Sequence, residues 1–362
     1  MSETTVFLTG FPGFLGSALT ERLVARGRSV TCLVQPKYRQ KAEQRAREIE
    51  RESTGDESEG IELLAGDITE SDLGLGEEMG PLQTDTDAVY HLAAVYDLAV
   101  SREVGMVVNV DGTKNVLDFA DGCGDLRRFQ YVSTCYVNGR YDGTFTEDHL
   151  VEGQQFNNYY ETTKYLAEVA VQERMANGLP ATIYRPGIVV GSSETGETQK
   201  YDGPYYLLRW LLRQPSVAIA PTLGNPATYE VNVVPRNFVV DAIDELSRLD
   251  ESVGEVYQLC DPNPLTVDEM LRVFGRATGK RVVRVPVPKS ALKRVLSSLP
   301  ELGIEPATLD YFDQPTSYAC ENTLAALETI DEPVRCPAFG SYVGNLVSFV
   351  REHPEITPDA MV

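Results

Sequence analysis

The chain has little of several residue types. Its 362 residues include three histidines, one tryptophan and eight lysines, and its six cysteines form no C-x-x-C pair. These counts and spacings give no obvious cluster of metal ligands, so no metal site is expected. A run of about 18 apolar residues, which a membrane-spanning helix needs, is also missing. Residues 1–5 are polar and do not resemble a signal peptide. We therefore expect a soluble, cytoplasmic protein without a membrane span.

Basic residues are few relative to acidic ones. There are 54 acidic and 32 basic residues, and the formal net charge of −22 is spread along the chain. Such a surface disfavours nucleic acid and anionic membranes as partners. An acidic, lysine-poor surface suits a cytoplasm with molar salt, so a halophilic source is one hypothesis. An ordinary acidic enzyme is the alternative.

A glycine turn follows the first apolar run, residues 6–8. It comprises Thr9, Gly10, Phe11, Pro12, Gly13, Phe14, Leu15 and Gly16. Leucines 15, 19 and 23 then recur at helical spacing up to Gly27. Strand, glycine turn and helix together favour a dinucleotide site, where the pyrophosphate lies on the helix N-terminus. The spacing is G-x-x-G-x-x-G rather than the commoner G-x-G-x-x-G, and an ordinary glycine turn is the alternative.

The end of the second predicted strand, residues 30–34, bears on the choice of cofactor. NAD enzymes often place a carboxylate there to bind the ribose 2′-hydroxyl. This chain has Gln35 instead, with Lys37 and Arg39 close by. The pattern favours NADP over NAD. Alternatively, the two cations belong to a solvated helix start.

Apolar strands and helices continue to alternate. Further strands are predicted at 61–65, 88–94, 129–133 and 181–185, which indicates an α/β fold with a Rossmann-type, doubly wound parallel sheet. A helix at 236–249 and a strand at 255–259 are predicted to return to this domain, residues 1–190. Cys32 and Cys260 fall in strands and are expected to be buried.

The rest of the chain is predicted to form a smaller, mostly helical substrate-binding region, residues 191–235 and 261–362. A helix over 338–351 is expected to dock onto the molecule. Residues 37–60 are predicted to form a solvated helix and, from 53, a mobile acidic loop. One group of residues is expected either to line an apolar pocket or to form ordinary core: Tyr201, Pro204, Tyr205, Tyr206, Tyr311, Phe312 and Tyr318.

Tyr160 is the only tyrosine followed four residues later by lysine, Lys164. On a helix the two side chains share a face. A cation beside a phenol lowers its pKa, which makes the tyrosine usable as a general acid or base. By itself this spacing also arises by chance.

Taken in order, these motifs resemble the extended short-chain dehydrogenase/reductase superfamily over roughly the first 190 residues. The matching segments are the glycine turn, Asp67, residues 91–94, residues 109–113, Ser133-Thr134, the Tyr160/Lys164 pair and residues 185–187.

The resemblance implies a role for each matching residue. Tyr160 would donate or accept the proton, Lys164 would bind the nicotinamide ribose and lower the tyrosine pKa, and Thr134 would hydrogen-bond the substrate oxygen. Asn109 would hold a proton-relay water. Further cofactor contacts would come from Asp67, Ile68, Leu92, Ala93, Ala94, Pro186, Gly187 and Ile188. Ser133 is the alternative hydroxyl, Asn109 is alternatively a helix N-cap, Thr134 is alternatively strand-end packing, and His91 is expected to be structural.

Segments 184–191, 93–98 and 231–235 are most similar to the thioester reductase and fatty acyl-CoA reductase branch. That branch implies an NAD(P)-dependent oxidoreductase acting on a carbonyl, alcohol or acyl thioester of an apolar molecule. Because the first strand begins near residue 4, no adenylation or carrier domain is expected before it, and the acyl chain would arrive on CoA or on a separate carrier.

Two other functions remain open. An NAD-dependent nucleotide-sugar epimerase or dehydratase would use the same Tyr160, Lys164 and Thr134, and a non-catalytic nucleotide sensor would share the fold. The superfamily also implies a possible homodimer through the helices that carry Asn109 and Tyr160.

Overall fold

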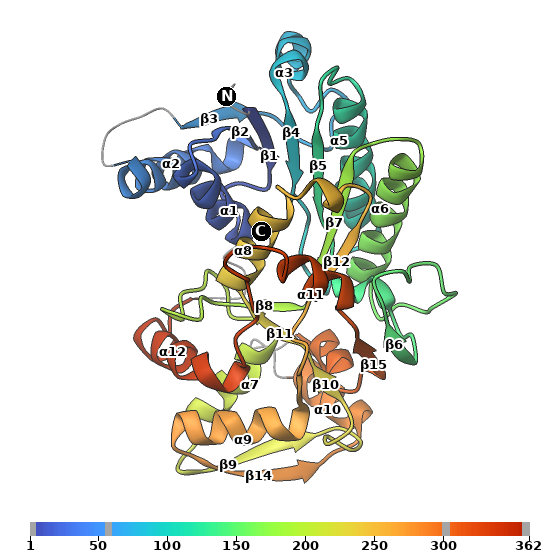
Figure 1. Cartoon of the computed structure of the whole chain (residues 1–362). Coiled ribbons are helices and arrows are strands. Elements are labelled where there is room, and N and C mark those ends of the chain that lie inside the picture. The colour runs from blue at the N-terminus through green and yellow to red at the C-terminus, as the bar shows by residue number, and fades with distance from the viewer. Residues whose placement is uncertain (1–4, 55–59, 299–304, 357–362) are drawn as a thin grey trace.

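A seven-stranded parallel sheet forms the body of the molecule in the computed structural model, which describes residues 5–54, 60–298 and 305–356 (Figure 1). The strand order is β3-β2-β1-β4-β5-β7-β12. The strands are β1 (Thr5–Thr9), β2 (Ser29–Val34), β3 (Ile61–Ala65), β4 (Ala88–His91), β5 (Arg128–Val132), β7 (Ala181–Pro186) and β12 (Val256–Leu259). The order reverses direction between β1 and β4, so the predicted doubly wound sheet is confirmed.

Helices cover both faces of this sheet, because successive strand residues point to opposite sides. Val6 and Leu8 pack toward α1 (Phe14–Ala25), α2 (Arg39–Thr54) and α8 (Arg236–Leu246). Phe7, between them, packs toward α3 (Met79–Asp85), α5 (Gly112–Asp121) and α6 (Tyr159–Ala176). Strands with two buried faces explain the near-continuous apolar runs in the sequence.

A smaller C-terminal region lies beneath the sheet in Figure 1. Its helices are α7 (Pro204–Leu212), α9 (Val267–Thr278), α10 (Lys289–Ser298) and α12 (Phe339–Glu352). Its short strands form three pairs: β8 (Ile188–Val190) with β11 (Val233–Pro235), β9 (Val217–Thr222) with β14 (Arg281–Pro286), and β10 (Glu230–Val231) with β13 (Leu265–Thr266). Tyr342 and Leu346 of α12 are buried in the core of this region, so the docking predicted for the last helix is confirmed.

One segment departs from the predicted division of the chain. Within 261–362, α11 (Glu321–Leu327) packs against α8 and β12, and Leu327 joins the core of the sheet. The buried carboxylate of Glu147 fixes the start of this helix by accepting hydrogen bonds from the backbone N–H groups of Asn322 and Thr323, at 2.8 and 2.9 Å. The chain therefore enters the body once more before α12.

The smaller predictions have different outcomes, and some are confirmed while others are not. Cys32 and Cys260 are buried, as expected. The strand expected over 88–94 ends at His91, and the last bond of its ladder with β1 runs from the N–H of Leu92 to the carbonyl of Thr9, at 3.1 Å. The helix expected after residue 37 is α2, whereas residues 55–59 of the expected acidic loop lie outside the described residues. Within the described ranges, no helix is long and apolar enough to cross a membrane.

Candidate active site

The glycine turn joins β1 to the N-terminus of α1 and exposes backbone to the site. Gly10 has φ of +102°, and a Cβ there would lie 2.9 Å from the backbone of Leu92 and Ala93. A Cβ on Gly16 would lie 2.3 Å from the carbonyl oxygen of Gly10. Only glycine therefore fits at both positions. The resulting cradle of N–H groups at a helix N-terminus suits a pyrophosphate.

Buried hydrogen bonds tie the turn to the neighbouring strand and helix. Thr9 Oγ1 lies 2.7 Å from Nδ1 of His91, and Nε2 of that ring lies 2.9 Å from Thr113 Oγ1. Burial, together with the charge of Lys164, lowers the pKa of His91 to about 3. The imidazole is thus neutral and fully engaged, which fits the structural role expected for it.

Of the two cations predicted to bind the cofactor near the end of β2, one lines the cofactor cavity and the other does not. Lys37 lines the cavity, whereas the Arg39 guanidinium turns away, donating to the carbonyl of Leu63 and pairing with Glu43, both at 2.8 Å. Arg39 is the one predicted cofactor residue that does not line the cavity. Residues two apart on a helical segment point to different sides, whereas residues four apart share a face. Lys41, four after Lys37, lines the cavity and was missed.

Gln35 also has an unexpected partner. Its side-chain amide donates to Asp67 Oδ2 at 2.7 Å, and the other carboxylate oxygen accepts from the backbone and hydroxyl of Thr69, both at 2.9 Å. A carboxylate therefore does lie near the end of β2, although it comes from the segment after β3. Ile68 is fixed beside it, because its carbonyl accepts from Asn115 at 2.8 Å.

Helix α6 brings the central residues together. Asn158 caps its N-terminus, accepting from the N–H of Glu161 at 3.0 Å, so Tyr160 lies in the first turn and Lys164 one turn later. Thr134 follows β5 and lies beside Tyr160, whose pKa its hydroxyl lowers. Tyr160, Lys164 and Thr134 are only 7%, 4% and 5% exposed, and all three line the cofactor cavity.

The pKa values of Lys164 and Tyr160 are not shifted as the sequence predicted. Lys164 Nζ donates to the carbonyl of Val132 at 2.9 Å and to the hydroxyl of Tyr131 at 3.0 Å. Burial lowers the pKa of Lys164 to about 7, although Glu168 opposes the shift. Burial also raises the pKa of Tyr160, against the hydrogen bond with Thr134. In the protein alone, desolvation thus outweighs the lowering of the tyrosine pKa that was expected from Lys164.

A buried network decides between the two candidate hydroxyls. Ser133 Oγ donates to Glu168 at 2.5 Å, and Arg185 donates to the same carboxylate through Nε and Nη2, at 2.9 and 2.6 Å. All three residues are buried. The Ser133 hydroxyl is committed to this network, so Thr134 is the hydroxyl beside Tyr160.

Asn109 holds the site together from outside the cavity. Its side chain accepts from the N–H of Val95 at 2.8 Å and donates to Thr163 Oγ1 at 3.0 Å. It lies in a π-helical stretch, Met106–Asp111, between α4 (Arg102–Gly105) and α5, so the alternative of a helix N-cap is wrong. Such π-bulges are frequent at functional sites. Here the amide ties the segment after β4 to α6.

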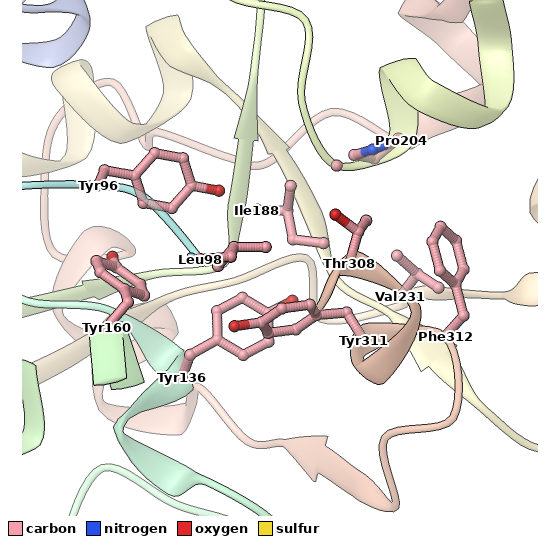
Figure 2. A pocket seen from close by; sticks show the side chains of 11 residues that line it. Tyr96, Leu98, Tyr136, Tyr160, Ile188, Pro204, Val231, Thr308, Tyr311 and Phe312 are labelled. Atoms are coloured by element: carbon pink, nitrogen blue, oxygen red, sulfur yellow. The ribbon is translucent and has the colours of Figure 1, made fainter. Parts of the chain in front are cut away.

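The cofactor cavity has a volume of about 490 Å³ and runs from the glycine turn to Tyr160. A second, smaller cavity of about 30 Å³, the aromatic cavity, lies beyond (Figure 2). Its wall is formed by Tyr96, Leu98, Tyr136, Tyr160, Ile188, Gly203, Pro204, Val231, Thr308, Tyr311 and Phe312. Of the aromatic group predicted as pocket or core, Tyr311 and Phe312 join Pro204 at this wall, whereas Tyr201 and Tyr205 are buried core. Tyr96 and Tyr136 were not foreseen.

The fold, the matching family model and the relatives described below place the chain in the extended short-chain dehydrogenase/reductase superfamily, in its thioester reductase branch. More narrowly, the chain belongs to the family described as male sterility protein, whose model matches residues 8–243.

Similar proteins include much longer chains. The chain is 29% identical over 274 residues to a non-canonical nonribosomal peptide synthetase, cpsA, of Aspergillus campestris, a match that covers 71% of this chain and 26% of that protein. It is 26% identical over 303 residues to the aldehyde reductase lnbA of Aspergillus flavus, covering 78% and 29% of the two chains. The chain thus spans roughly a quarter of the length of these relatives.

Solved structures show the same fold. The terminal R domain from the myxalamid PKS-NRPS biosynthetic pathway superposes with a TM-score of 0.83 at 29% identity, covering 99% of this chain and 93% of that one. UDP-glucuronic acid 4-epimerase from Bacillus cereus, in complex with NAD, gives a TM-score of 0.69 at 16% identity, covering 99% and 100%.

Proposed function

We propose that this protein is an NADPH-dependent reductase of acyl thioesters with apolar acyl groups, presented on CoA or on a carrier protein. One observation carries the proposal: the neighbouring side chains of Tyr160 and Thr134 lie where the cofactor cavity approaches an aromatic cavity. A substrate carbonyl there would meet both hydroxyls, with an apolar wall for its acyl chain. The likeness to the peptide synthetase cpsA and to the myxalamid R domain supports a thioester over a sugar nucleotide.

The residues have distinct tasks in this reaction. Thr134 would hold the carbonyl oxygen, and Tyr160 would supply a proton as negative charge develops on it. Lys164 would bind the nicotinamide ribose and, once charged, favour proton release by Tyr160. The bound cofactor would supply the hydride. A C–H bond forms and the C–S bond breaks, so one NADPH and one proton yield an aldehyde, a free thiol and NADP⁺.

The cofactor fits the residues present. Side chains at Gly10 and Gly16 would collide with backbone, so the cradle is shaped for a ligand approaching the main chain closely. Lys37 and Lys41 line the same cavity and would meet a ribose 2′-phosphate. Asp67 is held by Gln35 and would contact the adenosine. These cations support NADP over NAD.

The test is oxidation of NADPH, beside NADH, followed by absorbance with a panel of acyl-CoAs, aldehydes, ketosteroids and UDP-sugars. Oxidation of NADPH by acyl-CoAs, with a free thiol released in equal amount, is the expected result. Aldehyde reduction without thioester reduction would restrict the activity to carbonyls. If no substrate in the panel causes oxidation of NADPH or NADH, and cofactor is tightly bound to the purified protein, the epimerase or dehydratase alternative would be favoured.

We also propose that the protein works at molar salt. The support is the net charge of −22 with only eight lysines. At about 1 M salt the Debye length is only ~3 Å, so repulsion between surface carboxylates is screened. Activity should fall when KCl is lowered below about 1 M, the salt at which this screening is nearly complete. Full activity in dilute buffer would contradict a halophilic origin.

A further inference from the structure

Tyr96 lies beside the proposed proton donor. It belongs to the segment after β4, where Asn109 pins the neighbouring Val95. The Tyr96 ring meets the Tyr160 ring edge-on, with centroids 5.1 Å apart and planes at 79° (Figure 2). Tyr96 lines both the cofactor cavity and the aromatic cavity. Its ring is therefore a shared wall next to the reacting hydroxyl.

Two charged residues from the segment before α7 hold this ring. The carboxylate of Asp202 lies beside the Tyr96 hydroxyl, which lowers the pKa of that carboxyl. Lys200 Nζ lies 3.6 Å from Asp202 Oδ2, donates to the carbonyl of Tyr96 at 3.4 Å, and lies 4.6 Å from the centre of its ring. Tyr96, Lys200 and Asp202, here called the Tyr96 clamp, thus join the body to the C-terminal region across the site.

The clamp also acts on Tyr160 through charge. Burial is the main cause that raises the pKa of Tyr160, and the negative charges of Glu161 and Asp202 add to it. Burial raises the pKa of Asp202 itself, whereas Lys200 lowers it. The other titratable groups around Tyr160 and Tyr96 are Lys164 of α6, Tyr131 of β5, Tyr136 after β5 and Tyr206 of α7. Asp202 is a carboxylate from the C-terminal region, and it contacts Tyr96, the wall that the two cavities share.

We infer that Tyr96, held by Lys200 and Asp202, is a positioning and specificity-determining residue that sets which acyl groups can bring their carbonyl to Thr134 and Tyr160. This inference rests on the proposed reductase function. An acyl chain in the aromatic cavity must lie along the Tyr96 ring, because the ring borders both cavities at Tyr160. Although Tyr96 is 42% exposed, Lys200 contacts both its carbonyl and its ring face, and these contacts oppose displacement of the ring by a bulkier chain.

The wall is tested by Tyr96→Ala and Tyr96→Phe, with acyl-CoAs of increasing chain length. Tyr96→Ala should shift the preference toward longer or bulkier acyl groups, changing the ratio of kcat/KM values about tenfold or more. Tyr96→Phe keeps the ring but loses the hydroxyl beside Asp202, so KM for the acyl substrate should rise while KM for NADPH stays within about twofold. Unchanged chain-length ratios in Tyr96→Ala would overturn the inference.

The charge is tested by Asp202→Asn, which retains a hydrogen-bond acceptor for Tyr96. A carboxylate disfavours the phenolate, so its removal lowers the pKa of Tyr160, and proton donation fails at lower pH. The alkaline limb of kcat for aldehyde reduction should move down by about half a unit to one unit. Asp250→Asn, which removes an exposed carboxylate distant in sequence and bonded to Arg128, is the matched control and should leave the limb in place.

Two failures are distinguishable here. A parent protein that leaves NADPH untouched with every substrate overturns the proposed function, and this role of Tyr96 with it. In the other failure the parent is active, while the Tyr96→Ala and Asp202→Asn variants fold, bind NADPH and keep the parent's chain-length preference and alkaline limb of kcat. That result would support the reductase function and overturn only the inference about the Tyr96 clamp. Fluorescence titration with NADPH and the melting temperature establish folding in each variant.

Discussion

The cofactor cavity and the aromatic cavity present different surfaces to a ligand. At the glycine turn the wall is backbone, drawn from consecutive residues on the edge of a seven-stranded sheet. At the aromatic cavity the wall is side chains, from segments as distant as Tyr96, Tyr136 and Phe312. A backbone wall can hardly vary without moving the sheet, whereas a side-chain wall can change one residue at a time. The first suits a fixed ligand, and the second suits a substrate that differs between relatives.

The largest expected effect lies where the two walls meet. Tyr160→Phe removes the proton donor while keeping the ring that packs against Tyr96. We expect kcat to fall by about 10²- to 10⁴-fold, the usual contribution of general acid–base catalysis. NADPH binding, measured by fluorescence titration, should be unchanged. Turnover within a few fold of the parent would refute the proposed mechanism.

The backbone wall should tolerate almost no change. In Gly16→Ala the new Cβ would lie 2.3 Å from the carbonyl oxygen of Gly10, so the turn must move. We expect NADPH affinity to fall at least tenfold and stability to drop by about 1–3 kcal/mol, as for other overpacked sites. Gly80→Ala is the matched control, because its Cβ would meet nothing within 4 Å. Equal NADPH affinities of Gly16→Ala and Gly80→Ala would contradict the expectation that the backbone wall tolerates almost no change.

The side-chain wall should respond in substrate binding and not in NADPH binding. Phe312→Ala removes an aromatic ring from the aromatic cavity. KM for an apolar acyl substrate should rise about tenfold, which corresponds to about 1.4 kcal/mol. This is at the low end of the ~1.5–3 kcal/mol for fully burying such a ring, because Phe312 is only partly buried. NADPH affinity should stay constant. Phe349→Ala, which deletes a partly buried ring of α12 packed on the core of the C-terminal region, should lower the melting temperature without raising KM.

The smallest effect concerns the far end of the cofactor cavity. Lys41 lines that cavity, whereas Arg39 points to Leu63 and Glu43. Lys41→Met should raise KM for NADPH roughly fivefold, equivalent to about 1 kcal/mol for one hydrogen bond, and leave NADH unaffected. Arg39→Met should change neither. A larger loss in Arg39→Met would reverse the assignment of the two cations.

The residues predicted for the cofactor half line one cavity, apart from Arg39, because their sequence signals are local. The turn at residues 9–16 and the Tyr160/Lys164 pair each lie within one short segment, where spacing alone determines which groups share a face. Lys41 could have been found in the same way, four residues after Lys37. The substrate half resisted prediction because Tyr205 and Tyr311 have the same chemistry, yet one is core and the other lines a cavity. Only tertiary packing separates them. Burial likewise decided the pKa of Tyr160, and burial is not visible in a spacing.

The repeated crossing of the chain between the body and the C-terminal region constrains how such an enzyme can diversify. After β7 the chain leaves the body, returns with α8 and β12, leaves again, and returns once more with α11 before α12. The C-terminal region therefore exists as three separate segments interleaved with the sheet. A new specificity cannot be acquired by recombining one contiguous block of gene, and a chimaera made at a single junction would exchange part of the sheet as well. Point substitution of wall residues is the route that this connectivity leaves open.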